Sequence, residues 1–384
     1  MKYKLDDVCI FINGGAWSDK EYVNKGLPVL KVTNCKSKGF ELDDIDYLPI
    51  SSSQLYAKNK LVKGDVVIAT VGSHPNLVDS TAGRSCIVSS IVEGFYLNQN
   101  AVCIRTKDSN ILDQKYLGYL TKYRLFQNYI QMRGKGAANQ MRIAIGAIKS
   151  FEFDFPDIDT QRRIGNILSS YDALIEINQR QIKLLEEAAQ RLYKEWFVNL
   201  RFPGYEDAQI VDGVPEGWKQ SKVTELLEIK YGKDHKALED GEIPVYGSGG
   251  VMRKVKQILY SGESVLIPRK GSLNNILYVD CDFWTIDTMF YSIPRMKDVA
   301  KYSYLYLITR DMYSFNIGAA VPSMTTKILD GMDILLPDET ALAKFETAVS
   351  PLFEKKKLLE KQNGQLTEAR DRLLPKLMSG EIEL

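Results

Sequence analysis

Three residues in the last part of the chain come nearest to a catalytic set. The Pro-Asp pair at 337–338 and the Glu-Lys-Lys run at 354–356 together fit the PD…(D/E)xK pattern of metal-dependent nucleases, with Asp338, Glu354 and Lys356 in the key positions. Two observations favour a plainer interpretation, a turn at a helix start followed by a solvated charged face. Lys356 falls on the apolar repeat of a predicted helix, and the Pro-Asp pair recurs at 156–157 without a following Glu-x-Lys. A DNA-binding nuclease that uses these three residues therefore stays as the alternative hypothesis.

Other signatures of catalysis are absent from the sequence. The two histidines, His74 and His235, lie in no HExxH or similar ligand spacing, and there is no GxxxxGK[ST] phosphate loop. No GxSxG elbow is present, and no Asn-Pro-Pro or Asp-Pro-Pro sequence of the kind that amino-methyltransferases use. We therefore expect a chain with no catalytic residue, no metal site and no bound cofactor of its own.

Polar loops rich in glycine and basic residues are better candidates for function. They span residues 70–76 and 133–142 in the first half of the chain, and 246–254, 268–275 and 321–327 in the second. Arg suits guanine and Asn or Gln suits adenine in the major groove, whereas Lys, Ser, Thr and the N–H groups of Gly suit phosphate oxygens. The residues that we expect to contact DNA are Ser73, His74, Asn76, Arg133, Lys135, Asn139, Gln140, Arg142, Arg253, Lys254, Arg269, Lys270, Ser272, Asn274, Asn275, Ser323, Thr325 and Lys327.

An internal repeat sorts these loops into two sets. A shift of 181 residues carries the Pro-Asp pair at 156–157 onto the pair at 337–338 and aligns the following segments without a gap. Upstream, Gly-Ala-Ala at 136–138 reappears at 318–320, and the Gly-Ser pair at 72–73 reappears at 271–272. The matches keep their order along the chain, which indicates two copies of one unit.

The second half of each copy is predicted to be a long helix with an apolar seam at heptad spacing. The seam residues are Ile164, Leu168, Tyr171, Ile175, Asn178, Leu185, Leu192, Phe345, Val349, Leu352, Leu359, Asn363, Leu366 and Leu373. Two such seams predict an antiparallel coiled coil with pseudo-two-fold symmetry, in which Asn178, Asn363, Lys356 and Arg370 set the register. The alternative is that each helix packs only on its own module.

The ends of these helices are predicted from local signals. Thr160 and Thr340 are expected to cap the two N-termini. The Pro-Gly pair at 203–204 is expected to close the first helix, and Pro375 to end or kink the second. In each module one further helix is expected, at 114–132 and at 299–313.

These observations predict a mixed α/β (α+β) fold in four segments. The first recognition module spans 1–157 and the first long helix 158–200; the second module spans 201–338, with an entry linker at 201–218, and the second long helix spans 339–384. Short β-rich runs at 65–71, 101–106, 264–267 and 289–293 alternate with turn residues inside the modules.

Composition limits the class of protein without choosing the function. A length of 384 residues with 45% hydrophobic and 26% charged residues fits two or three globular domains. No apolar run suits a membrane span, the N-terminus lacks a signal peptide, and the five scattered cysteines form no CxxC pair, so a reduced cytoplasm is the simplest compartment. A net charge of +1 leaves phosphate neutralisation to local surfaces or to partners.

Two divergent modules, each ending in a Pro-Asp turn and a heptad helix, resemble the DNA specificity subunit (HsdS) of type I restriction-modification systems. The resemblance is carried by DGVPEGWK at 212–219, LPKLMSGEI at 374–382 and QRRI at 161–164, and it covers essentially the whole chain. It departs at the second helix start, where 341–344 reads ALAK.

The resemblance implies that each module is a target-recognition domain that reads one half of a bipartite, asymmetric site in double-stranded DNA. The helices would set the spacing of the half-sites and dock two methyltransferase (HsdM) subunits, with motor-nuclease (HsdR) subunits in a system that also cleaves. S-adenosylmethionine, ATP and Mg are then expected on the partner subunits and not on this chain. A coiled-coil adaptor with no role on DNA stays open as a third hypothesis.

Overall fold

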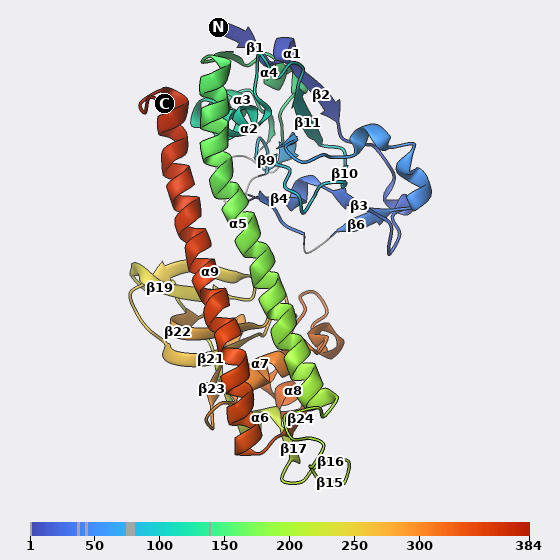
Figure 1. The fold of residues 1–384 in the computed structure, drawn as a ribbon, viewed down its shortest axis with the longest axis vertical. Helices are drawn as coiled ribbons and strands as arrows, with labels where there is room; N and C mark the ends of the chain where they lie inside the picture. The colour runs from blue at the N-terminus through green and yellow to red at the C-terminus, as the bar shows by residue number, and fades with distance from the viewer. Residues whose placement is uncertain (1, 37–38, 43–44, 74–80, 138–139) are drawn as a thin grey trace. The chain divides into compact units, whose positions relative to one another are not determined.

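The computed structural model describes residues 2–36, 39–42, 45–73, 81–137 and 140–384. The chain forms two compact units: unit 1 comprises Met1–Gln179 and Lys361–Leu384, and unit 2 comprises Arg180–Glu360. The long helices α5 (Ile158–Tyr193) and α9 (Glu339–Ser379) each contribute one end to unit 1 and the other end to unit 2 (Figure 1). Each unit thus contains one of the predicted modules together with parts of both helices.

Unit 1 is built on a four-stranded antiparallel sheet in the order β2-β11-β7-β9, against which helix α2 packs. The buried face of α2 carries Tyr116, Leu117 and Leu120, which join the sheet in one hydrophobic core. A three-stranded sheet (β10-β3-β6) and the hairpin β4-β5 are added to this frame. The elements are β1 (Lys2–Lys4), α1 (Leu5–Val8), β2 (Cys9–Asn13), β3 (Leu27–Leu30), β4 (Cys35–Lys36), β5 (Gly39–Phe40), β6 (Asp46–Leu48), β7 (Val66–Ala69), β8 (Val71–Gly72), β9 (Ser85–Ile87), β10 (Tyr96–Leu97), β11 (Ala101–Thr106), α2 (Gln114–Lys122), α3 (Arg124–Gln131), β12 (Lys135–Ala137), β13 (Gln140–Arg142), α4 (Ile145–Lys149) and β14 (Glu152–Asp154).

Unit 2 is built on a six-stranded sheet in the order β18-β23-β21-β22-β19-β20, with helix α7 packed on β21 and β22. Its core gathers Val265, Ile267 and Phe290 from the sheet with Tyr302 and Leu305 from α7. The elements are β15 (Ile210–Val211), β16 (Val214–Pro215), β17 (Lys219–Lys222), α6 (Val223–Leu226), β18 (Leu227–Tyr231), β19 (Asp240–Gly247), β20 (Gly250–Val255), β21 (Tyr260–Pro268), β22 (Leu277–Thr285), β23 (Met289–Pro294), α7 (Ala300–Ile308), α8 (Thr326–Gly331) and β24 (Asp333–Leu336).

The two units repeat one frame. In each, a short strand (β1 or β17) leads through a short helix (α1 or α6) into the edge strand of the sheet (β2 or β18). The strand orders β2-β11-β7-β9 and β18-β23-β21-β22 correspond position for position. A last short strand before the long helix returns to pair with the first one, β14 with β1 and β24 with β17. The predicted mixed α/β fold is confirmed, and the repeat extends through the modules as well as the helices.

Within each unit the two long helices run antiparallel (Figure 1). In unit 1 the Asn178 side-chain amide donates to Asn363 Oδ1 at 2.9 Å, and six residues earlier on α5 Asp172 pairs with Arg370. Residue numbers therefore increase along α5 in the direction in which they decrease along α9, so the two helices run in opposite directions. In unit 2 Lys356 of α9 pairs with Glu186 of α5 at 2.6 Å. The predicted antiparallel coiled coil is confirmed in both units.

The seam positions are buried or half-buried, and none of them is exposed. Leu377 near the end of α9 lies in the core of unit 1 with Ile164 and Leu168, whereas Phe345 and Val349 near its start lie in the core of unit 2. The alternative in which each helix packs only on its own module is therefore wrong.

The long helices are capped by the Asp of each Pro-Asp turn, and the predicted caps Thr160 and Thr340 are wrong. Asp157 Oδ1 accepts from the Thr160 backbone N–H at 2.9 Å, and Asp338 Oδ1 accepts from the Ala341 N–H at 2.8 Å. Both threonines lie inside the first turn. The carboxylate stands three residues before the unpaired N–H, which is the spacing that an N-cap requires.

Several predicted helix ends are also corrected. Helix α5 ends at Tyr193 and continues as one π-helical turn, η5 (Lys194–Val198); Leu200, at φ 58°, then takes the left-handed conformation that ends helices, before the Pro-Gly pair is reached. Helix α9 does not end at Pro375 but runs to Ser379, with Leu377 and the next residue buried in unit 1. Of the two effects expected of this proline, the helix end is wrong and the kink stays a prediction.

The single helices expected inside the modules are each interrupted. The stretch 114–132 forms α2 and α3, because Tyr123 between them is extended (ψ 139°). The stretch 299–313 forms α7, followed by a 3₁₀ turn, η6 (Met312–Phe315), whose N-terminus is capped by the Asp311 side chain.

Candidate nucleic-acid interface

In unit 1 the two predicted loops meet as a small sheet in the order β12-β13-β8. Strand β8 belongs to the first loop, and β12 and β13 belong to the second. Arg142 pairs with Val71, and the next residue, Ile143, donates its N–H to the Thr70 carbonyl at 2.8 Å. We call this place junction 1 (residues 70–73, 135–136 and 141–143).

Junction 1 has one buried face and one solvent face, because side chains alternate along a strand and paired residues point the same way. Met141 is 3% exposed, and its partner Gly72 lies so close to neighbouring atoms that a Cβ there would stand 2.4 Å from Ala82 N. Only glycine fits at that position. The next pair across the strands, Lys135 and Arg142, is exposed on the other face.

In unit 2 the loops at 268–275 and 321–327 meet in the same way. The Met324 N–H donates to the Arg269 carbonyl at 2.8 Å, and Lys270 forms an isolated antiparallel bridge with Ser323. We call this place junction 2 (residues 268–275 and 321–325). The third predicted loop joins it, because the Asn275 side-chain amide donates to the Ser248 carbonyl at 2.8 Å.

Several of the predicted DNA contacts in unit 2 are engaged within the protein. The Asn274 side chain accepts from the Met312 N–H at 2.7 Å and so ties junction 2 to η6. Arg253 donates to Asp240 at 2.6 Å and Lys254 to Glu242 at 2.9 Å, both across the hairpin β19–β20. With Asn275 on the Ser248 carbonyl, these residues hold the loops in shape, a role that the sequence did not indicate.

Two arginines at the interface lie over tyrosine rings. The Arg133 guanidinium carbon is 3.6 Å from the centroid of Tyr129, and that of Arg269 is 5.4 Å from Tyr231. Arg269 also donates to the Asp287 carbonyl at 3.0 Å. Stacking of this kind fixes a guanidinium plane while leaving part of its edge for hydrogen bonding. The tyrosines were not among the predicted site residues. For Tyr129 a signal was available, because it stands four residues before Arg133, a spacing at which side chains meet on a helix; no such spacing links Tyr231 to Arg269.

The remaining predicted contacts are placed as follows. Ser272, Thr325 and Lys327 are exposed, and Ser73 and Ser323 are half-buried at the two junctions. Gln140 lies in β13, where its backbone pairs with residue 137. His74, Asn76 and Asn139 lie outside the described residues.

The nuclease alternative finds no support in the geometry of its three residues. Asp338 is engaged at the start of α9, where its side chain also accepts from the Trp218 indole N–H at 3.0 Å. Glu354 is exposed on the same helix sixteen residues later, roughly 24 Å along the axis at 1.5 Å per residue. A metal-binding pair of carboxylates requires both groups around one cation, so these residues form no active site.

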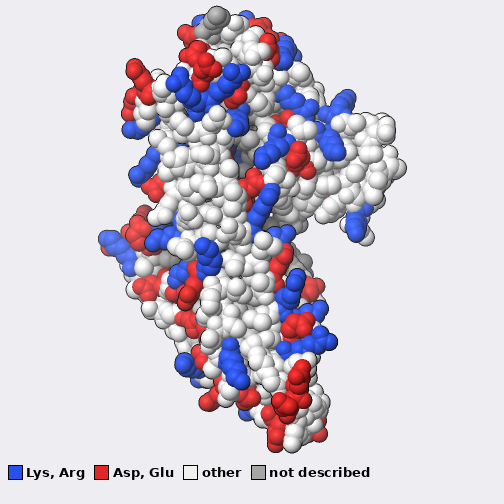
Figure 2. Space-filling model, viewed as in Figure 1, with Lys and Arg blue, Asp and Glu red and all other residues white. Residues whose placement is uncertain are grey.

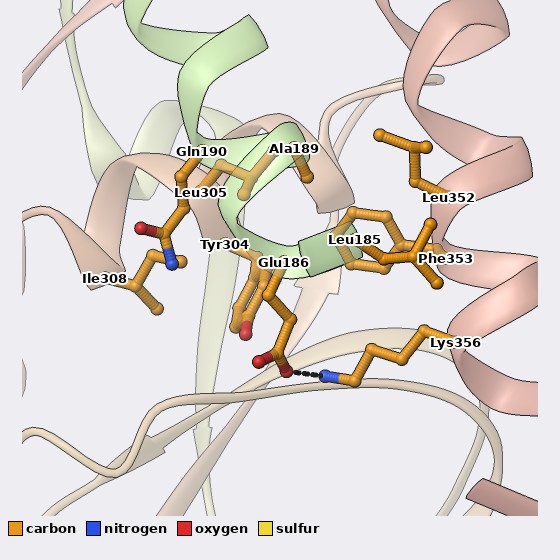
Figure 3. Close-up of a pocket in the computed structure, with 10 residues that line it drawn as sticks. All are labelled: Leu185, Glu186, Ala189, Gln190, Tyr304, Leu305, Ile308, Leu352, Phe353 and Lys356. Atoms are coloured by element: carbon orange, nitrogen blue, oxygen red, sulfur yellow. Dashed lines mark ion pairs between the residues drawn. The ribbon is translucent and has the colours of Figure 1, made fainter. Parts of the chain in front are cut away.

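Lys356, the third member of that set, belongs to the helix pair. Figure 3 shows it at the edge of a small, mainly apolar hollow between α5, α7 and α9, with its ammonium directed at Glu186. Burial opposes its charge, but Tyr304 and the Glu186 carboxylate together raise the pKa of Lys356. The lysine therefore stays charged and locks the register of the two helices in unit 2.

Metal-binding clusters and activated thiols are the other features of the described residues that could support catalysis. The His, Cys, Asp and Glu among these residues form no group that could hold a metal ion. Burial raises the pKa of the Cys9 thiol to about 12 and also raises the pKa of Cys281, and a protonated thiol is a poor nucleophile. A hydrogen bond with the Cys35 thiol lowers the pKa of Cys86, but the Cys86 side chain is fully buried, out of reach of a substrate. Among the described residues no helix is long and apolar enough to cross a membrane.

Comparison with known proteins gives a consistent family. The family model described as "Type I restriction modification DNA specificity domain" matches residues 1–187 and 215–367. The type I restriction enzyme MjaIX specificity subunit of Methanocaldococcus jannaschii is 26% identical over 75% of this chain and 73% of its own length. The HindI specificity subunit of Haemophilus influenzae is 21% identical over 99% of both chains.

The fold is also shared with a solved structure. The crystal structure of a type I restriction-modification S subunit from M. genitalium has a TM-score of 0.57 to this chain, with 19% identity, and the match covers 98% of this chain and 95% of the other.

Proposed function

The chain belongs to the type I restriction-modification DNA specificity family, and from this premise we propose that unit 1 and unit 2 each read one half of a bipartite, asymmetric site in double-stranded DNA. Specifying the DNA sequence is the function of this family. The internal repeat described above supports one recognition role for each unit.

One observation carries this proposal: two matched frames bring matched loops together at junctions 1 and 2. The frames agree in strand order, but the inserted segments and the junction side chains differ. Similar frames give similar placement on DNA, whereas different side chains select different bases. Two readers of this kind produce a target whose halves are unlike each other.

The helix pair is proposed to dock two methyltransferase (HsdM) subunits, with motor-nuclease (HsdR) subunits as further partners where the system cleaves. Large apolar side chains are exposed on α5, with Leu174 47% and Ile177 50% exposed in unit 1 and Leu184 63% exposed in unit 2. Figure 2 shows that much of the surface over the helices carries no charged side chain. Exposed apolar patches of this kind are typical of surfaces that bind another protein.

Catalysis is proposed to reside on those partners, in the cytoplasm where the DNA is. This chain would bind no S-adenosylmethionine, ATP or Mg, and would supply sequence choice and spacing alone. The proposal rests on the engaged positions of Asp338 and Lys356 and on the family's assignment to specificity.

The test is to express the chain with and without a partner methyltransferase (HsdM) subunit and to map methylated adenines in the host DNA. We expect a bipartite motif only when both proteins are present, and no methylation or nicking by the purified chain alone. Methylation or cutting by this chain alone would overturn the proposal.

The spacing role has its own test. Four residues inserted after Asn178, and the matching four inserted before Asn363 to keep the pairing, would lengthen the helix pair by about 6 Å. We expect the gap between the two half-motifs to change while both half-motifs stay the same. An unchanged gap in a folded variant would show that the helices do not set the spacing.

A further inference from the structure

Junction 1 places two like charges directly opposite each other. Lys135 of β12 and Arg142 of β13 are cross-strand partners, so their side chains leave the sheet on the same side. Both are exposed, and within the described part of the chain neither forms an ion pair with a carboxylate. Like charges in this arrangement destabilise a strand pair, so the folded protein gains nothing from them.

A stable fold does not explain this pair, but an anionic ligand does. The opposite face of the same strands is committed to the core, since Met141 is buried against Gly72. The register of β13 is therefore fixed, and it holds Lys135 and Arg142 on the solvent face. An anion at this face would receive two positive charges from a surface that is already ordered.

Junction 2 holds a positive charge at the corresponding place but takes it from the other strand. Aligning the Gly-Ser pairs at 72–73 and 271–272 puts Val71 at Lys270, and the 181-residue shift puts Arg142 at Ser323. The structure agrees, because Arg142 is paired with Val71 and Lys270 is paired with Ser323. In each unit one partner of this cross-strand pair is basic and the other is not.

The position of the charge is thus kept while the residue that supplies it changes. A base contact depends on the side-chain type and should differ between two halves of an asymmetric site. A phosphate contact carries no sequence information and is needed by both halves alike. A cation at one place in two otherwise different readers matches the second requirement.

We propose that Arg142 with Lys135 in unit 1, and Lys270 in unit 2, are equivalent anchors for DNA backbone phosphates, which position each unit on its half-site without reading it. This inference rests on the DNA-recognition function proposed above. Lys270 lies 3.8 Å from Asp287, but both side chains are well exposed, and such a pair is weak enough for a phosphate to displace the carboxylate.

The experiment measures binding of the purified full chain to two duplexes, one with the mapped methylation motif and one with the same bases scrambled, across a series of NaCl concentrations. The variants are Arg142→Gln, Lys135→Gln and Lys270→Gln. Lys63→Gln is the matched control, because this exposed lysine precedes β7 whereas junction 1 follows it, at the other end of the strand. All four substitutions remove one positive charge.

We expect each junction variant to weaken binding to both duplexes by a similar factor and to lower the slope of log K against log [NaCl] by about 0.9. The motif methylated in cells should stay the same, and the melting temperature of Lys135→Gln and Arg142→Gln should be unchanged or higher, because a repulsion is removed. Lys63→Gln should bind like the wild type.

Two results would overturn the inference. If a junction variant relaxes the methylated motif at one base while the salt slope holds, that side chain reads a base. If the slope and the affinities match those of Lys63→Gln, the junction does not contact DNA. Failure of the wild-type chain to prefer the motif in the presence of its methyltransferase would instead count against the proposed function itself.

Discussion

Unit 1 and unit 2 hold an equivalent carboxylate in different ways. Asp65, just before β7, is 2% exposed in its side chain and forms two hydrogen bonds with the Arg105 guanidinium of β11, at 2.6 and 2.7 Å. Its counterpart is Glu263 on β21, which follows Gly262 as Asp65 follows Gly64; its side chain is 41% exposed and accepts from Lys301 of α7 at 2.8 Å. Lys301 in turn reaches Glu346 of α9 at 2.6 Å. The frame keeps the acidic position, but unit 1 binds it within the sheet and unit 2 uses it to tie the sheet to two helices.

The difference indicates which parts of the frame are constrained. Strand order and the acidic position recur, while the basic partner moves between elements, as the junction cations do. Burial then decides how much each ion pair contributes to stability. Removing the partner of a buried charge lowers the free energy of unfolding strongly, whereas removing the partner of an exposed charge changes it little.

The largest expected effect is at Asp65. Asp65→Ala should lower the free energy of unfolding of unit 1 by about 3 kcal/mol, because the partly buried Arg105 guanidinium loses its carboxylate partner and keeps only the Lys60 carbonyl, and the Val62 N–H loses its acceptor. Glu263→Ala should lower that of unit 2 by only about 1 kcal/mol, since Lys301 keeps Glu346. Urea denaturation of the full chain, followed by circular dichroism, measures both.

Glu242→Ala, which removes an exposed partner of Lys254, is the control and should change little. A loss at Glu263 equal to that at Asp65 would contradict the comparison. Acid gives a second check. Although partial burial opposes it, hydrogen bonds from Lys301 and Tyr278 lower the pKa of Glu263. Its contribution is therefore present above the ordinary Glu pKa and lost as the pH falls through the lowered value, so wild type and Glu263→Gln should converge in strong acid.

A smaller effect is expected at the polar point of the seam in unit 1. Asn178→Leu alone should destabilise by about 1–2 kcal/mol, because Asn363 is left without its partner in a half-buried position. Asn178→Leu combined with Asn363→Leu should recover this loss and exceed wild-type stability by about 1 kcal/mol. The reason is that an apolar pair in a coiled-coil seam is more stable than a polar pair, although it no longer specifies the register of the helices. Thermal melts of wild type, the two single variants Asn178→Leu and Asn363→Leu, and the double variant close a double-mutant cycle. An additive loss in the double variant would rule out this role.

The smallest effect is at the helix caps. Asp338→Ala should lower the free energy of unfolding by about 1 kcal/mol, because the first turn of α9 loses its acceptor and Trp218 loses its indole partner. Asp157→Ala should have less effect, since no indole depends on that exposed carboxylate. Thr340→Ala should have none. Methylation by the complex should persist in all three, whereas loss of a nuclease activity in Asp338→Ala alone would restore the alternative hypothesis.

Much of the architecture could be predicted because it follows from the periodic spacing of apolar residues and from the internal repeat. The heptad seam fixes which face of α5 and α9 is buried, and a gapless shift of 181 residues fixes which residues are equivalent. The same alignment placed the loops of junction 1 and of junction 2 in matching sets. Their meeting as paired strands was not predicted and is known only from the strand register.

The individual roles of loop residues could not be predicted, because they depend on partners far away in the sequence. Asn274 is engaged by η6, and Arg253 by the other strand of its hairpin, and no spacing rule encodes either contact. The caps were misplaced for a different reason: the Pro-Asp turn looked like a connection, although its carboxylate already stood at the N-cap position. The opposed charges of Lys135 and Arg142 became visible only once the strand register was known.

The interleaving of the two units along the chain has a consequence for biosynthesis. All of unit 2 lies in Arg180–Glu360, whereas the core of unit 1 needs Leu377 and Met378 from the end of α9 as well as residues near the N-terminus. At about 5–20 residues per second, roughly 10–40 s pass between synthesis of the two parts of unit 1. The unit whose synthesis begins first is therefore completed last. The part of its helix seam on α5 stays exposed until the last turns of α9 have been synthesised.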